Sequence, residues 1–328
     1  MVIPPASTVL AVRWPERFRR EQIAALLGAA DPVEVVFTSC GAEGDNAAIR
    51  GILEASPGKR HIVTTQVEHP AVLALCQHLE KRGYRVTWLK VDVEGMLDPD
   101  ELRDALTDDT ALVSVMYANN ETGVIFPIDA IGKIVKARSI PFHVDAVQVA
   151  GKIPLNLQTG PVDLLTISGH KFHGPKGIGA LYIRRGITFR PFIVGGHQER
   201  SRRGGTENVA GIVGMGMAAE VALKHLGEED GKVRPLRDQL ERSLLDACPG
   251  CRVNGHREKR IPNTSNVSFK FLEGEAILVL LDQYGICAST GSACTAGSVE
   301  PSHVLRAMGV PPDWIQGAVR FSLSRYST

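Results

Sequence analysis

Short runs of β-branched residues alternate with helix-like segments from residue 20 to residue 183, and this alternation limits the folds open to the chain. Strands that alternate with helices favour a mostly parallel sheet with helices on both faces. Little sequence separates the last two predicted strands, so we expect an antiparallel strand to end the series. The seven predicted strands are Val33–Thr38, His61–Gln66, Tyr84–Lys90, Ala111–Ala118, Phe142–Val147, Leu164–Ser168 and Gly179–Ile183.

The pattern changes after residue 208. A long helical stretch runs from Val209 to about Leu245, and we expect Gly227 and Pro235 to break it. A second alternating region follows, with segments at Asn266–Phe271, Glu275–Tyr284, Ile286–Ala288, Ser302–Met308 and Val319–Ser322. The sequence therefore predicts an atypical segment over 1–19, a large domain over 20–225 and a smaller C-terminal α/β domain over 226–328.

Charge and hydropathy exclude several function classes. The 37 Lys and Arg residues nearly balance the 36 Asp and Glu residues, which argues against a protein that binds nucleic acid by neutralising phosphates. No stretch approaches 18 consecutive apolar residues, so no membrane span is expected. The N-terminus lacks a secretory signal, and six cysteines in this length do not form a disulfide scaffold, so we expect a cytoplasmic protein.

The strongest chemical signal is Lys171, which follows a predicted buried strand in Ser168-Gly169-His170-Lys171. Desolvation at such a place depresses the pKa of a lysine amine and suits it to Schiff-base chemistry. Ser168 and His170 can donate hydrogen bonds to an anion. The alternative interpretation is a glycine-rich turn with a surface lysine.

Three more strand ends carry polar groups. Asp145 ends one predicted strand, with Gln148 just after it, and a carboxylate there could pair with a protonated pyridine nitrogen of a cofactor. His69 and Asn120 follow two other strands, and the imidazole could stack on a flat ring. Alone, Asp145 is better explained as a helix cap, and a turn histidine explains His69 at least as well. Four polar strand ends on one rim are harder to explain by structure alone.

Two residues in the C-terminal part are further candidates. Cys294 lies in a loop of small residues, where a thiol is available as a nucleophile if its pKa is lowered, or is incidentally exposed. Arg320 lies in the last predicted strand and could hold a substrate carboxylate, or form an ion pair at a domain edge. The pair Cys248 and Cys251 has no second ligand pair at metal-binding spacing, so no metal site is predicted. We interpret the remaining three cysteines as packing residues: Cys40, Cys76 and Cys287.

Taken together, these motifs resemble the NifS-type cysteine desulfurases, which belong to the class V aminotransferases and the fold-type I pyridoxal-phosphate enzymes. The resemblance runs from about Arg20 to the C-terminus. The string over residues 291–308 resembles the long-loop desulfurases more than the short-loop type. The strings that carry it are Phe-Thr-Ser-Cys-Gly-Ala-Glu-Gly-Asp-Asn (37–46), Val-Glu-His-Pro-Ala-Val-Leu (67–73), Ala-Asn-Asn-Glu-Thr-Gly (118–123), His-Val-Asp-Ala-Val-Gln (143–148), Ser-Gly-His-Lys (168–171), Gly-Gly-His-Gln-Glu-Arg (195–200), Arg-Arg-Gly-Gly-Thr-Glu-Asn (202–208) and Gly-Ser-Ala-Cys-Thr-Ala-Gly-Ser-Val-Glu-Pro-Ser-His-Val-Leu-Arg-Ala-Met (291–308).

The resemblance implies a role for each matching residue. Lys171 would bind pyridoxal 5′-phosphate as a Schiff base and carry the α-proton, and Cys294 would take the substrate sulfur as a persulfide. Arg320 and Asn120 would hold L-cysteine, which leaves as L-alanine. The remaining implied cofactor contacts are Asp145 at the pyridine nitrogen, Gln148 at the ring hydroxyl, His69 on the ring face, Ser168, His170, Gly41 and Ala42 at the phosphate, and Thr206 at the phosphate of a neighbouring subunit.

The family likeness also implies partners: a homodimer, and a sulfur-acceptor scaffold protein of iron–sulfur cluster assembly, either for nitrogenase or for general cluster assembly. The sequence differs from the family pattern in three ways. Ala42 replaces the usual threonine that helps to bind phosphate, residues 1–19 lack the family's N-terminal strings, and the chain stops at Thr328. We therefore expect a desulfurase that lacks both family ends, with weakened stability. The alternatives are a selenocysteine lyase or other class V lyase, and a catalytically impaired remnant.

Overall fold

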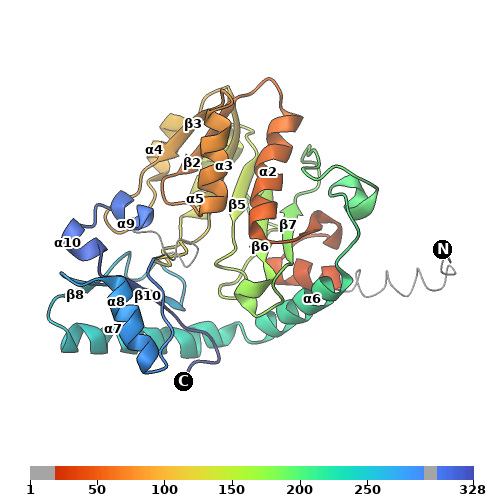
Figure 1. Ribbon diagram of the computed structural model, residues 1–328. Helices are drawn as coiled ribbons and strands as arrows, with labels where there is room; N and C mark the ends of the chain where they lie inside the picture. The colour runs from red at the N-terminus through yellow and green to blue at the C-terminus, as the bar shows by residue number, and fades with distance from the viewer. Residues whose placement is uncertain (1–18, 292–300) are drawn as a thin grey trace.

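The computed structural model describes residues 19–291 and 301–328, which form a seven-stranded sheet and a three-stranded sheet with their helices (Figure 1). Cys294 lies outside the described residues. In the large sheet the strand order is β1-β7-β6-β5-β4-β2-β3. The strands are β1 (Val35–Thr38), β2 (His61–Thr65), β3 (Arg85–Leu89), β4 (Thr110–Met116), β5 (Phe142–Asp145), β6 (Leu164–Ser168) and β7 (Gly179–Ile183).

The predicted mostly parallel sheet of seven strands is confirmed. Strands β2 to β6 run parallel to one another, whereas β7 pairs antiparallel with both β6 and β1. The expected antiparallel strand is therefore present. Because β7 reverses direction between them, β1 points the same way as β6.

Both faces of the sheet are buried, which explains its nearly continuous apolar strands. Successive strand residues point to opposite faces, so neighbours such as Ile62 and Val63 belong to two separate apolar cores. The core on one face includes residues of α2 (Gly41–Ala55) and α3 (Pro70–Glu80). The core on the other face includes residues of a helix whose described part covers 19–27, and of α4 (Pro99–Ala105), α5 (Ile128–Ala137) and α6 (Val209–Lys224).

The small sheet is antiparallel, in the order β10-β9-β8. Its strands are β8 (Cys251–Val253), β9 (Thr264–Phe269) and β10 (Ala318–Ser322), and its helices are α7 (Arg234–Ala247), α8 (Gly274–Gln283), α9 (His303–Ala307) and α10 (Pro312–Ile315). In Figure 1, α6 and α7 run along one side of the molecule from the large sheet to the small one.

Several sequence expectations for this part are wrong. Residues 286–288 have no strand geometry, and the short strand β8 was not predicted, because three residues carry too little periodicity. Pro235 does not break a helix, since it lies in the first turn of α7, where a missing N–H costs nothing. The break expected at Gly227 is present, because the helical path bends by 64° between Lys224 and Glu229, before a π-helical turn at Glu229–Val233 leads into α7.

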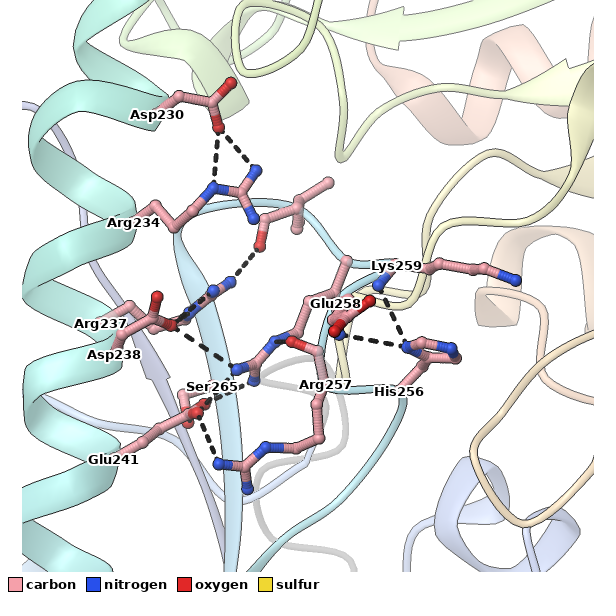
Figure 2. A network of polar contacts seen from close by, with 12 residues as sticks. Asp230, Arg234, Arg237, Asp238, Glu241, His256, Arg257, Glu258, Lys259 and Ser265 are labelled. Atoms are coloured by element: carbon pink, nitrogen blue, oxygen red, sulfur yellow. Dashed lines mark hydrogen bonds and ion pairs between the residues drawn. The ribbon is translucent and has the colours of Figure 1, made fainter.

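Charged groups join α7 to the small sheet (Figure 2). Glu241 of α7 accepts hydrogen bonds from Arg260 (Nη2 to Oε2, 2.6 Å) and from the Ser265 hydroxyl of β9 (2.6 Å). Arg237 donates to the carbonyl of Ile261 (2.9 Å). Glu241 and Arg260 are both only 2% exposed, so this network is buried in the molecule rather than laid on its surface.

In the described part of the chain, no single helix has both the length and the apolar composition to cross a membrane. The segments Val209–Lys224 and Glu229–Ala247, bent by 64° relative to one another, meet that length and composition test only as a pair.

Candidate active site

The carboxyl ends of the parallel strands meet at one edge of the large sheet, and four predicted site residues gather there. Asp145 is the last residue of β5, and Lys171 lies in the 3-10 turn Gly169–Phe172 that follows β6. His69 and Asn120 follow β2 and β4. All four line one cavity of about 220 Å³. This is the edge at which open α/β sheets bind ligands.

The N-terminus of α2 supplies the wall of this cavity that suits an anion. Strand β1 ends at the same edge, and Cys40, Gly41 and Ala42 then begin α2 and line the cavity. The first N–H groups of a helix have no acceptor within it, so they attract phosphate. A Cβ at Gly41 would lie 2.9 Å from Val147 Cγ2, so only glycine lets the backbone come this close.

Ser168 lies beside the first residue of α2, and together with His170 it extends the anion-binding wall. Both line the cavity, and the Ser168 hydroxyl lies 2.9 Å from His170 Nδ1. Burial, with the charges of Lys171 and Lys176, lowers the pKa of His170. A neutral imidazole next to a hydroxyl can donate one hydrogen bond and accept another, which suits the oxygens of a phosphate.

Asp145 is the acidic group of the cavity. It is buried, and burial raises the pKa of its carboxyl to about 6, although the Val147 N–H (2.9 Å from Oδ1) and the charge of Lys171 act in the opposite direction. A buried carboxylate is stable only beside a positive charge or hydrogen-bond donors. A protonated pyridine nitrogen would supply both.

His69 presents a neutral ring to the same cavity. Burial is the main cause that lowers the pKa of His69, and the charges of Lys171 and His303 lower it further. Its Nδ1 accepts a hydrogen bond from the Ala71 N–H (3.1 Å) at the start of α3, which leaves the ring proton on Nε2. The imidazole is thus held as a fixed, flat and uncharged surface.

Arg320 connects the small sheet to this site. It comes from β10, and its Nη1 donates to the carbonyl of Asn120 (2.6 Å). In the described part of the chain Asn120 Oδ1 has no hydrogen-bond partner, although the residue is buried. Arg320, Asn120, Gln148 and Lys171 also line an adjoining cavity of about 410 Å³, which leaves room for a ligand beside Lys171.

Other predicted residues lie elsewhere. Thr206 does not line the cavity of Lys171; it lines a separate cavity of about 170 Å³ with Ser39, Arg203 and Asn208. The prediction for Cys294 lies outside the described residues. Of the three cysteines interpreted as packing residues, Cys76 is buried as expected. Cys287 is exposed, and Cys40 lines the cavity of Lys171.

Sequence reasoning gave no role to Asp45, which also lines the cavity. Asp45 belongs to the string 37–46, one of those that carry the family resemblance. The signal that could have found it is its separation of four residues from Gly41, which places both residues on one face of α2.

Comparison with known proteins agrees with this geometry. The aminotransferase class-V family model matches residues 17–328. The chain belongs to the class-V aminotransferase family. It is 64% identical over 312 residues to a cysteine desulfurase of Nostoc sp. (95% of this chain, 78% of that protein), and 52% identical over 309 residues to the cysteine desulfurase NifS of Azotobacter vinelandii (94% and 77%).

A solved structure described as a NifS-like protein has a TM-score of 0.92 and 40% identity, and the match covers 99% of this chain and 86% of that one. The resemblance to NifS-type cysteine desulfurases, with their fold and enzyme class, is therefore confirmed. Nothing in these comparisons favours a selenocysteine lyase, another class V lyase or an impaired remnant.

The enzymes of this family use pyridoxal phosphate, and the residues around the cavity fit that group. An amine, a buried carboxylate on the same sheet edge, a neutral flat imidazole and a helix N-terminus match its aldehyde, ring nitrogen, ring face and phosphate. Asn120 Oδ1, which has no hydrogen-bond partner among the described residues, would provide one more polar contact.

Proposed function

We propose that this chain is a cysteine desulfurase that binds pyridoxal phosphate on Lys171 and converts L-cysteine to L-alanine. One observation carries the proposal: Lys171 and the buried Asp145 line the same cavity as the N-terminus of α2. A lysine, a carboxylate and a phosphate-binding helix end at one rim are what this cofactor requires. The identity to cysteine desulfurases of 52–64% supports the same activity.

The cavity residues would hold the cofactor at four points. Asp145 would pair with the ring nitrogen and Gln148 with the ring hydroxyl, while His69 lies against the ring. The phosphate would be bound by Ser168, His170 and the first amides of α2 at Gly41 and Ala42. When bound, the cofactor supplies an electron sink that makes the α-proton of an amino acid acidic.

The chain's own residues would then orient the substrate and move its proton. Arg320 would hold the carboxylate of L-cysteine with Asn120 beside it, which places the α-carbon next to the Lys171 amine. The Nζ atom of Lys171 would take the α-proton and return a proton. Because Arg320 already contacts the Asn120 carbonyl, the guanidinium is held at the cavity before the substrate arrives.

The sulfur step needs the Cys294 thiolate. It would attack the substrate sulfur, so that an S–S bond forms while the C–S bond breaks. The electron pair of the C–S bond stays on the carbon, which is protonated to give L-alanine. The thiol becomes a persulfide, and the sulfur is then transferred to an acceptor.

The wider setting of the activity is part of the proposal. We propose a cytoplasmic homodimer in which Thr206 reaches the phosphate of the neighbouring subunit, consistent with its place in a separate cavity. The acceptor would be a scaffold protein of iron–sulfur assembly. The division into a large domain (20–225) and a small domain (226–328) would let Arg320 move relative to Lys171.

The cofactor site can be tested by adding pyridoxal phosphate to the purified protein and recording its visible absorption. We expect a new band that shifts when L-cysteine is added. Borohydride reduction should then fix the cofactor covalently to Lys171, as mapped by mass spectrometry. A folded protein that gives no band, or a label on another lysine, would contradict the proposal.

Ala42 offers a direct test of the phosphate wall. The Ala42→Thr substitution adds a hydroxyl at the exposed start of α2, and one more hydrogen bond to a charged phosphate should lower the dissociation constant of pyridoxal phosphate about 10-fold. The dissociation constant is measured by fluorescence quenching. Ala42→Val, which has the same branching without the hydroxyl, should bind no more tightly than wild type. Equal constants for all three proteins would refute the idea.

A further inference from the structure

The cavity of Lys171 is lined by a second buried carboxyl, Asp45, to which the proposed chemistry gives no role. It is on α2, it is only 1% exposed, and it lines the same cavity as Asp145 and Lys171. Among residues 19–291 and 301–328, its Oδ1 has no hydrogen-bond partner. A buried carboxylate in this position is costly unless a cation or donors compensate it.

His143 is a candidate cation beside Asp45, but its ring is neutral. Its Nε2 is 3.7 Å from Asp45 Oδ1 but only 3.0 Å from the Thr166 hydroxyl, and its Nδ1 is 2.8 Å from the Ser114 hydroxyl. Both ring nitrogens thus have hydroxyl partners. Burial lowers the pKa of His143 to about 3, so the imidazole is neutral at pH 7.

Lys171, Arg320, His69 and His170 line the same cavity, but the charges that act on the Asp45 carboxyl come from three acids. They are Asp145 at the end of β5, Glu68 between β2 and α3, and the Cys40 thiol at the start of α2. Burial and these groups raise the pKa of Asp45 well above its usual value, while a hydrogen bond from Thr166 acts in the opposite direction. The amine of Lys171 acts on Asp145, whose carboxyl therefore ionises more readily.

We propose that Asp45 is a positioning residue that keeps its proton, so that Asp145 is the single negative charge at the floor of the cavity. Two carboxylates close together cannot both ionise without mutual repulsion. A neutral Asp45 leaves Asp145 as the only acidic partner for a cationic ring nitrogen. The inference rests on the proposed cofactor, but the charge of Asp45 can be measured without it.

The first arm of the test uses the protein without cofactor. The infrared difference spectrum between wild type and Asp45→Asn is recorded at pH 7 in the region of the carboxylic-acid C=O stretch. We expect the variant to lose one carboxylic-acid band, because asparagine has nearly the shape of aspartic acid but no carboxyl group. Glu68→Gln is the matched control: burial raises the pKa of Glu68 to about 8, so it should lose its own acid band. If Asp45→Asn loses a carboxylate band instead, the proposal is overturned.

The second arm measures the dissociation constant of pyridoxal phosphate at pH 7. The dissociation constant of Asp45→Asn should stay within about 3-fold of the wild-type value. Asp145→Asn should bind the cofactor at least about 10-fold more weakly, because it removes the negative charge that pairs with the ring nitrogen. Equal weakening in the two variants would mean that Asp45 is also charged, and would overturn the proposal. Asp45→Thr replaces Asp45→Asn if the latter does not fold.

The two arms separate this inference from the proposed function. If wild type fails to bind pyridoxal phosphate, the proposed function is wrong, and the infrared arm still decides the charge of Asp45. If wild type binds the cofactor but no acid band is lost in Asp45→Asn, only the inference about Asp45 fails.

Discussion

Replacing Lys171 with alanine should lower alanine formation from L-cysteine by about 10³-fold or more. The residue combines two functions in the account, since its amine holds the cofactor and moves the α-proton. Lys171→Arg should lose as much, because a guanidinium keeps the positive charge but has too high a pKa to act as a nucleophile or base. The rate of alanine formation is measured with saturating L-cysteine and pyridoxal phosphate.

Lys176→Ala is the matched control for that experiment. Lys176 is exposed and lies five residues further along the same loop, so its loss removes a lysine without touching the cavity. It should retain the wild-type rate. Activity in Lys171→Arg close to that of wild type would show that only the charge matters, and would contradict the assigned role.

The second large effect concerns stability. Replacing Glu241 with glutamine should lower the free energy of unfolding by about 3 kcal/mol, because it removes the buried counter-charge of the Arg260 guanidinium and leaves the partly exposed Asp238 at 3.8 Å. Burial alone would raise the pKa of Glu241, but the hydrogen bonds from Arg260 and Ser265 outweigh it and hold the pKa below the usual value. Urea unfolding followed by circular dichroism measures the difference.

The same network predicts a pH dependence. A group whose pKa is lowered by folding stabilises the protein above its unfolded pKa, which is about 4.3 for glutamate, and this contribution is lost as the pH falls through the lower folded value. The difference between wild type and Glu241→Gln should therefore shrink in acid. Asp230→Asn is the control, since the Asp230–Arg234 pair is at the surface and should contribute less than about 1 kcal/mol. Equal losses in both variants would contradict the assigned stabilising role of the buried network.

Much of the large sheet followed from the sequence, because its strands are buried on both faces and are separated by recognisable helices. Strands such as Leu164–Ser168 have the same bounds in the prediction and in the structure. The same reasoning placed Asp145 and Lys171 at one sheet edge, since parallel strands end together. Local sequence patterns were sufficient to predict the strands and their direction wherever strands alternate with helices.

The rest depended on contacts between distant segments. The Asn120–Arg320 hydrogen bond joins residues 200 positions apart, and no local pattern predicts it. Asp45 was missed because a carboxylate in the first turns of a helix usually indicates a solvated, dipole-stabilised end. Only the packing of α2 on the sheet shows that this side chain is buried.

The most direct test of the central claim is a single-turnover reaction of the pyridoxal phosphate-loaded protein with L-cysteine, without added reductant. The account predicts about one L-alanine per active chain and a persulfide mapped to Cys294 by mass spectrometry. Cys294→Ser should give neither product at a comparable rate. Formation of pyruvate and ammonia in place of L-alanine, or of L-alanine with the sulfur on another residue, would contradict the account.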